Sequence, residues 1–206
     1  MLQFITHQTD RYDTIQGALL ALQGGCRWIQ LRMKTAPHDE ILRNAIVLKR
    51  LCWDFGATLI IDDHVDICLM ADADGVHLGK EDMDPEKARI VLGKDKIIGG
   101  TANTFADVQL LAAKGVDYIG LGPYRFTETK KKLSPVLGLE GYRSVLENCK
   151  KLQLEVPVIA IGGLRDRDFH ALLETGVAGV ALSSSILSAV DPKAETKRLI
   201  QVLSER

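Results

Sequence analysis

The chain has 206 residues, 46% of them hydrophobic, and a formal net charge of −1 at pH 7. This is enough for one domain with a substantial core, and the near-zero charge argues against a general nucleic-acid or membrane binder. No apolar run approaches the roughly 18 residues of a membrane span. The first residues lack a signal-peptide layout, and the four cysteines lack metal-ligand spacing. These features predict a cytoplasmic protein with buried, reduced thiols.

Short apolar runs alternate with longer segments of helical period. Runs of this length, rich in Ile, Val and Leu and bounded by glycine, are typical of buried parallel strands. The eight runs are residues 2–6, 27–32, 58–62, 75–79, 96–100, 117–121, 156–163 and 178–184. Helices are expected at 38–53, 84–93, 104–115 and 166–176.

Eight near-equal strand–helix repeats without a linker predict an α/β fold, namely a (β/α)8 TIM barrel. The barrel is expected to form a single domain over residues 1–206. A doubly wound open sheet is the alternative, but eight repeats favour closure. In such barrels the site lies at the carboxyl ends of the strands, so the residues that follow each run are the candidates.

Three polar residues share one face at the end of the second run. Gln30, Arg32 and Lys34 recur at period 2, which is the period of side chains on one face of a strand. Arginine offers a planar fork and lysine a point charge, and together they suit a pyrophosphate. This pattern predicts an anion clamp.

Acidic residues follow the third and fourth runs. Asp63 comes at the end of the third run, and Asp82 comes soon after the fourth. Mg²⁺ takes one or two carboxylates together with phosphate oxygens and waters, so these two residues are predicted metal ligands. Asp84 precedes a proline at the start of an expected helix and is assigned to capping that helix.

Small residues follow the last two runs and predict a phosphate pocket. Gly162 and Gly163 follow the seventh run, and Ser183 and Ser184 follow the eighth, where free backbone amides bind phosphate in these barrels. The polar loop 122–138, with three consecutive lysines, lies between this pocket and the clamp. A monophosphate on one side and a metal-bound polyphosphate on the other predict a transferase that releases pyrophosphate from small-molecule substrates.

Taken together, these motifs resemble the thiamine phosphate synthase family from about residue 2 to residue 190. The family's Q-L-R-x-K motif falls on residues 30–34. Its N-D-[RH]-V-D, G-V-H-L-G-Q-E-D-M, G-P-x-x-x-T-x-T-K, A-I-G-G and G-V-A-V-x-S motifs correspond to residues 62–66, 75–83, 122–130, 160–163 and 179–184. Each motif is moderately specific, and the set in this order on a barrel pattern is strong.

The resemblance implies a reaction. 4-Amino-2-methyl-5-pyrimidinylmethyl diphosphate and 4-methyl-5-(2-phosphoethyl)thiazole would give thiamine phosphate and pyrophosphate by a dissociative path. The loop over residues 125–138 would act as a lid that keeps water from the cation. No general base is required, and the five scattered histidines are interpreted mostly as surface or packing residues. A homo-oligomer is compatible with this interpretation.

The resemblance also assigns roles to single residues. Mg²⁺ would be held by Asp63 and Asp82. The implied catalytic residues are Arg32, Lys34, Thr101 and Lys130. The implied substrate-binding residues are Gln30, Asp62, Thr127, Thr129, Gly162, Gly163, Ser183 and Ser184.

The chain departs from the family pattern at four positions. Asp62 replaces an asparagine, Lys80 a glutamine, Thr101 a serine and Asn103 a histidine. Two alternatives therefore stay open. A thiazole tautomerase on the same scaffold is disfavoured, because that relative tends to lose the clamp and uses a histidine where this chain has Asn103. A non-catalytic ligand-binding barrel is supported by Asp62, since a carboxylate beside a diphosphate is unfavourable unless it binds metal or is protonated.

Overall fold

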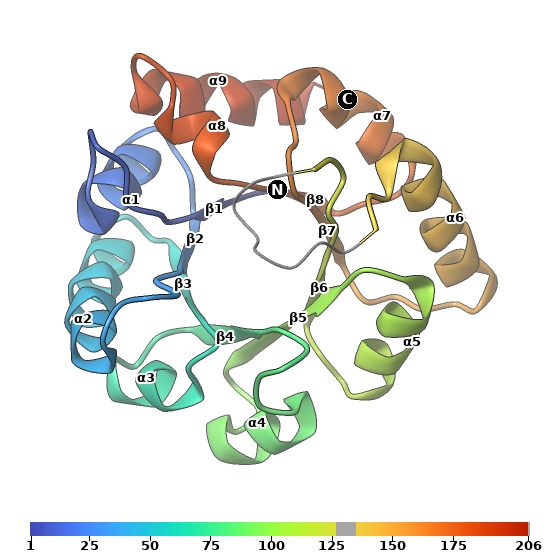
Figure 1. Cartoon of the computed structure of the whole chain (residues 1–206), viewed down its shortest axis with the longest axis horizontal. Helices are drawn as coiled ribbons and strands as arrows, with labels where there is room; N and C mark the ends of the chain where they lie inside the picture. Colours follow the sequence, from blue (N-terminus) through green and yellow to red (C-terminus); the bar gives the residue numbers. More distant parts are fainter. Residues whose placement is uncertain (127–134, 206) are drawn as a thin grey trace.

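The computed structural model describes residues 1–126 and 135–205. Eight strands, each parallel to both neighbours, form a closed barrel in sequence order, surrounded by helices (Figure 1). The first and last strands close the barrel with Gln3 opposite Ala181. The predicted (β/α)8 barrel is confirmed, and the open-sheet alternative is wrong.

Each predicted strand run overlaps one strand, and each expected helical segment contains helix. The strands are β1 Leu2–Ile5, β2 Trp28–Leu31, β3 Thr58–Asp62, β4 Gly75–Leu78, β5 Ile97–Ala102, β6 Tyr118–Leu121, β7 Val158–Ile161 and β8 Gly179–Leu182. The helices are α1 Thr14–Gln23, α2 His38–Asp54, α3 Val65–Met70, α4 Pro85–Leu92, α5 Phe105–Ala113, α6 Gly138–Lys151, α7 Phe169–Glu174, α8 Ser184–Leu187 and α9 Pro192–Ser204, with a 3-10 turn η1 at Asp166–Asp168.

Side chains at the helix starts bind free backbone amides. Asp84 caps α4, because its Oδ1 accepts from the amide of Glu86 at 2.9 Å and Pro85 begins the helix. Thr104 forms a capping box with Asp107 at the start of α5. The capping role predicted for Asp84 is therefore confirmed.

Apolar side chains alternate between two cores along the strands. Phe4 and Ile29 face outward and belong to the large cluster between the strands and the helices. Ile5, Tyr118 and Ile159 belong to a smaller cluster inside the barrel. All four cysteines are buried and unpaired, as predicted. Within the described residues, none of the helices has both the length and the apolar character that a bilayer crossing requires.

Polar side chains occupy inward-facing positions on the first four strands. Gln3, Gln30, Asp62 and His77 are all buried, and each has outward-facing apolar neighbours on its own strand. A polar interior on this side of the barrel is unusual for a packed core, because buried polar groups need partners. It marks where the site lies.

Candidate active site

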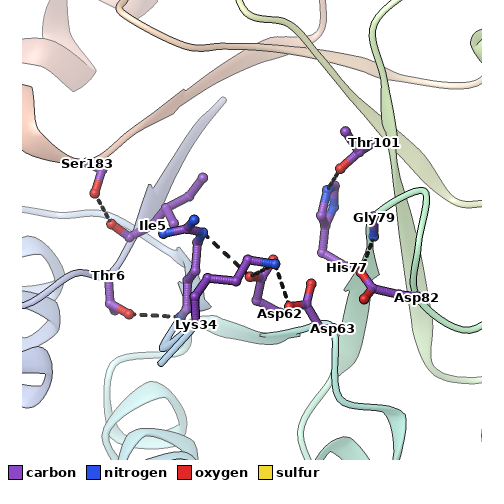
Figure 2. A network of polar contacts seen from close by, with 11 residues as sticks. Ile5, Thr6, Lys34, Asp62, Asp63, His77, Gly79, Asp82, Thr101 and Ser183 are labelled. Carbon is purple, nitrogen blue, oxygen red and sulfur yellow. Dashed lines mark hydrogen bonds and ion pairs between the residues drawn. The ribbon is translucent and has the colours of Figure 1, made fainter. Parts of the chain in front are cut away.

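Two cations meet one buried carboxylate at the carboxyl ends of β2 and β3. Arg32 follows β2, and its Nε lies 3.6 Å from Oδ2 of Asp62, the last residue of β3. Nζ of Lys34 lies 3.2 Å from the same oxygen and also bonds to Oδ2 of Asp63 (Figure 2). The predicted clamp residues are therefore close together, and Asp62 supplies their counter-charge.

Asp62 is the most buried acid in this cluster. Burial, followed by the charge of Asp63, raises the pKa of Asp62 to about 6, and the clamp cations oppose that rise. Among the described residues, its Oδ2 has ion-pair partners but no hydrogen bond. A buried charged oxygen is costly unless it is paired, and the two clamp cations supply that pairing.

Asp63 and Asp82 approach each other from neighbouring strand ends. The amide of Asp63 donates to the carbonyl of His77 at 2.8 Å, and the amide of Gly79 donates to Oδ2 of Asp82 at 2.7 Å (Figure 2). The two carboxyl groups influence each other, and their pKa values move in opposite directions. Burial and the neighbouring Asp63 raise the pKa of Asp82. Burial acts upward on the pKa of Asp63 as well, but the bond to Lys34 brings it below its ordinary value.

This carboxylate pair suits a hard divalent cation. Two neighbouring carboxyl groups repel each other when both are charged, and they gain from a cation between them. Among residues 1–126 and 135–205, no group of three or more His, Cys, Asp or Glu side chains could hold a metal ion. Two carboxylates are compatible with Mg²⁺, which takes one or two of them when substrate phosphate and water complete its shell.

The glycines after β7 lie against the loop that follows β6. Gly162 and Gly163 have φ values of +95° and +69°, which side chains rarely adopt. A Cβ at Gly162 would lie 2.7 Å from Cβ of Pro123, and one at Gly163 would lie 2.8 Å from Cβ of Arg125. Only glycine allows this close approach, so the predicted phosphate turn is also a contact between two loops.

Ser183 and Ser184 lie where α8 begins after β8. The hydroxyl of Ser183 donates to the carbonyl of Ile5 at 2.6 Å and lies 2.8 Å from Nδ1 of His7. Burial, followed by the charge of Arg32, lowers the pKa of His7. His7 therefore contacts the turn before α8 and lies within reach of the charge of Arg32.

Gln30 and Thr101 point into the barrel from β2 and β5. Gln30 is buried between its neighbours in the sheet, Ile5 and Ile60. Oγ1 of Thr101 lies 2.9 Å from Nε2 of His77 (Figure 2).

The loop after β6 is closed at its base. The amide of Leu137 donates to the carbonyl of Pro123 at 2.9 Å, and the amide of Gly138 donates to the carbonyl of Tyr124 at 3.1 Å. The predicted Thr127, Thr129 and Lys130 lie outside the described residues.

Two of the departures have local partners. Nζ of Lys80 donates to Asp107 at 2.7 Å, so this cation is paired with α5. The side-chain nitrogen Nδ2 of Asn103 donates to the carbonyl of Gly122 at the start of the loop. Asn103 therefore has a structural role where the tautomerase alternative needs a histidine.

Sequence reasoning missed three side chains in this region. Oγ1 of Thr6 accepts from the amide of Arg32 at 3.0 Å, and His7 contacts Ser183. Both residues directly follow β1, so applying the strand-end rule to the first strand would have found them. His77 lies in the barrel interior next to Thr101, and its role differs from the surface or packing role expected for most histidines.

The structure is a (β/α)8 barrel that gathers two cations and three carboxyl groups at the carboxyl ends of β2, β3 and β4. A family model described as thiamine monophosphate synthase matches residues 2–186, and the chain belongs to this family. The thiamine-phosphate synthases of Phocaeicola vulgatus and Bacteroides thetaiotaomicron are 58% and 56% identical to it over 201 residues, or 98% of this chain and 97% and 96% of those proteins. The structure of thiamine phosphate pyrophosphorylase from Pyrococcus furiosus has a TM-score of 0.86 at 34% identity, covering 99% of this chain and 95% of that one.

Proposed function

We propose that this chain joins 4-amino-2-methyl-5-pyrimidinylmethyl diphosphate to 4-methyl-5-(2-phosphoethyl)thiazole, giving thiamine phosphate and pyrophosphate. One observation carries the site assignment: Arg32 and Lys34 lie at the same barrel end as the Asp63–Asp82 pair. A single diphosphate could contact cations and a metal there. The thiamine-phosphate synthase names of relatives at 58% and 56% identity support the reaction.

The reaction breaks the bond between the pyrimidinyl methylene carbon and the diphosphate oxygen, and the electron pair leaves with the oxygen. The thiazole nitrogen then donates its lone pair to the methylene carbon, which forms the new C–N bond. Neither step transfers a proton, so the site needs no general base. Charge grows on the leaving diphosphate, and the preorganised cations Arg32 and Lys34 stabilise that charge.

Asp63 and Asp82 would hold Mg²⁺, which when bound supplies further stabilisation of charge on the diphosphate. The chain contributes the placement of both carboxylates. Lys34 fixes Asp63, and the amide of Gly79 fixes Asp82. Asp62 lies between the clamp cations, so the incoming diphosphate competes with its carboxylate.

The opposite side of the barrel mouth would take the thiazole phosphate. Gly162, Gly163, Ser183 and Ser184 lie on the turns after β7 and β8, where phosphate meets backbone amides in barrels of this kind. Holding both substrates at one barrel end removes much of the entropic barrier to their reaction. Gln30 and Thr101 point into the barrel from β2 and β5, and we assign them to the pyrimidine.

The test is product formation by the purified protein. We expect thiamine phosphate from the two substrates with Mg²⁺, detected by chromatography after oxidation to a fluorescent thiochrome. Arg32→Ala and Lys34→Ala should each lower kcat/KM by roughly 10²-fold or more, as for a lost charge contact in the transition state. Lys150→Ala, at an exposed position of α6, is the matched control and should leave the rate unchanged.

Thiazole isomerisation is followed in the same samples. Isomerisation without thiamine phosphate would establish the tautomerase alternative instead. Binding of both substrates without either reaction would establish the non-catalytic barrel.

A further inference from the structure

A line of hydrogen bonds crosses the barrel interior and ends at Thr101. Nε2 of Gln3 donates to the hydroxyl of Tyr118 at 3.3 Å. That hydroxyl lies 3.0 Å from Nδ1 of His77, whose Nε2 lies 2.9 Å from Oγ1 of Thr101. The line therefore joins β1, β6, β4 and β5, and Figure 2 shows its last contact beside the carboxylate pair.

A glycine makes the central contact possible. Gly99 on β5 lies between the other two strands, opposite His77 on one side and Tyr118 on the other. A Cβ at Gly99 would lie 2.2 Å from Cζ of Tyr118, which is too close for two carbon atoms that are not bonded. Because position 99 has no side chain, residues from two strands that are not neighbours can bond across it. Trp28 packs edge-on against Tyr118, with ring centroids 4.8 Å apart, and restricts the orientation of that ring.

The donors and acceptors along this line have a definite order. Burial raises the pKa of Tyr118 well above its usual range, so the phenol keeps its proton. Its oxygen accepts from Gln3, and a buried hydroxyl proton without an acceptor is unfavourable, so that proton goes to Nδ1 of His77. In this order the ring proton of His77 is on Nε2 and is donated to Oγ1 of Thr101.

The tautomer of His77 decides what Thr101 can offer a ligand. With the proton on Nε2, the hydroxyl of Thr101 accepts from the ring and its own proton is free to donate. With the proton on Nδ1, Thr101 would donate to the ring and offer a ligand only lone pairs.

We propose that Tyr118 and His77 are positioning residues that hold the Thr101 hydroxyl as a hydrogen-bond donor, so that the site selects a heteroaromatic substrate with an acceptor atom facing Thr101. This inference rests on the proposed function, in which that substrate is the pyrimidine diphosphate. Neither residue touches the reacting atoms; both act through Thr101.

The first test reads the tautomer directly. Long-range ¹H–¹⁵N correlation spectra of the ¹⁵N-labelled protein, with His77 assigned from the loss of its signals in His77→Asn, should show a protonated Nε2 and a bare Nδ1. Tyr118→Phe keeps the ring packing and removes the hydroxyl, and it should give a mixture of tautomers. A wild-type His77 protonated on Nδ1 overturns the proposal.

The second test reads substrate selection. Tyr118→Phe should raise KM for the pyrimidine diphosphate about tenfold and leave KM for the thiazole phosphate unchanged. Thr101→Val should do the same, and Thr101→Ser should restore the wild-type KM because it keeps the hydroxyl. An equal rise in both KM values, or an unchanged KM for the pyrimidine, overturns the proposal.

The two proposals can fail separately. A wild type that makes no thiamine phosphate refutes the proposed function and the selection argument with it. An active wild type with the Nδ1 tautomer refutes the positioning role alone.

Discussion

Arg125 binds both carboxylate oxygens of Asp168. Its two terminal nitrogens donate to Oδ1 and Oδ2 at 2.7 Å each, and one of them also donates to the carbonyl of Gly163 at 2.8 Å. The backbone amide of Arg165 donates to the same carboxylate at 2.8 Å. One side chain therefore ties the loop after β6 to the turn after β7, where the thiazole phosphate is proposed to bind.

We expect Asp168→Asn to lower the free energy of unfolding at pH 7 by about 1–3 kcal/mol, because it leaves a charged donor without its acceptor. The bond to Arg125 holds the pKa of Asp168 below its ordinary value. This stabilisation is therefore present above the unfolded carboxyl pKa of about 3.9 and is lost as the pH falls through the folded value. The difference in free energy of unfolding between wild type and Asp168→Asn should narrow below about pH 4. Urea unfolding at pH 7 and at pH 3.5 measures it.

The control for this prediction is Arg143→Ala. Arg143 pairs with Glu140 on the exposed side of α6, where ion pairs contribute little. The free energy of unfolding of Arg143→Ala should match that of wild type at both pH values. A loss equal to that of Asp168→Asn would show that the bidentate geometry has no special weight.

The Asp63–Asp82 pair predicts that Mg²⁺ raises the melting temperature of one variant and not of another. Asp82→Asn should abolish Mg²⁺-dependent activity, yet its melting temperature in EDTA should equal or exceed that of wild type, since one of two close carboxyl groups is neutral. Mg²⁺ should raise the melting temperature of wild type but not of this variant. Asp84→Asn, which keeps the cap of α4, should respond to Mg²⁺ as wild type does. An unchanged Mg²⁺ shift in Asp82→Asn would rule out the metal assignment.

Removing the charge of Asp62 should increase the affinity of the site for pyrophosphate. A carboxylate about 4 Å from a diphosphate oxygen costs about 1–4 kcal/mol, depending on screening. Asp62→Asn also removes one anion that competes for Arg32 and Lys34. The variant should therefore bind pyrophosphate at least about fivefold more tightly and need less Mg²⁺ for half-maximal rate. Calorimetric titration with pyrophosphate and rate measurements against Mg²⁺ test both. Equal curves for the two proteins would show that the charge of Asp62 does not oppose diphosphate binding.

The barrel and the positions of its strand ends follow from local sequence. Strand runs and glycine boundaries are local patterns, and parallel strands in a closed barrel present their carboxyl ends together. For this reason Arg32 and Lys34 could be placed near Asp63 and Asp82 before any contact was known. The cap by Asp84 followed in the same way from its proline neighbour.

Contacts that depend on register between strands could not be predicted. The bond between His77 and Tyr118 needs β4 and β6 to lie on either side of Gly99 at one level, which no local pattern states. The pairing of Lys80 with Asp107 likewise depends on where α5 lies against the loop after β4. Asp62 could be recognised as a departure, but its ion pairs with both clamp cations are visible only in three dimensions.

Replacing Gly162 by alanine should lower the free energy of unfolding for two separate reasons, the backbone conformation and a close contact. Gly162→Ala places a Cβ 2.7 Å from Pro123 at a φ of +95°, so it should lower the free energy of unfolding and shift the turn. Gly176→Ala is the matched control, because it has a φ of +101° but no atom within 4 Å of the new Cβ. Gly176→Ala should lose only the backbone part, about 1 kcal/mol, and keep its KM for the thiazole phosphate. Gly162→Ala should lose about 1–3 kcal/mol more and raise that KM, because the turn that faces the phosphate moves. Urea unfolding and steady-state kinetics measure both effects. If Gly162→Ala lost no more stability than the control and kept its KM, the close approach of the two loops would have no part in holding the thiazole phosphate.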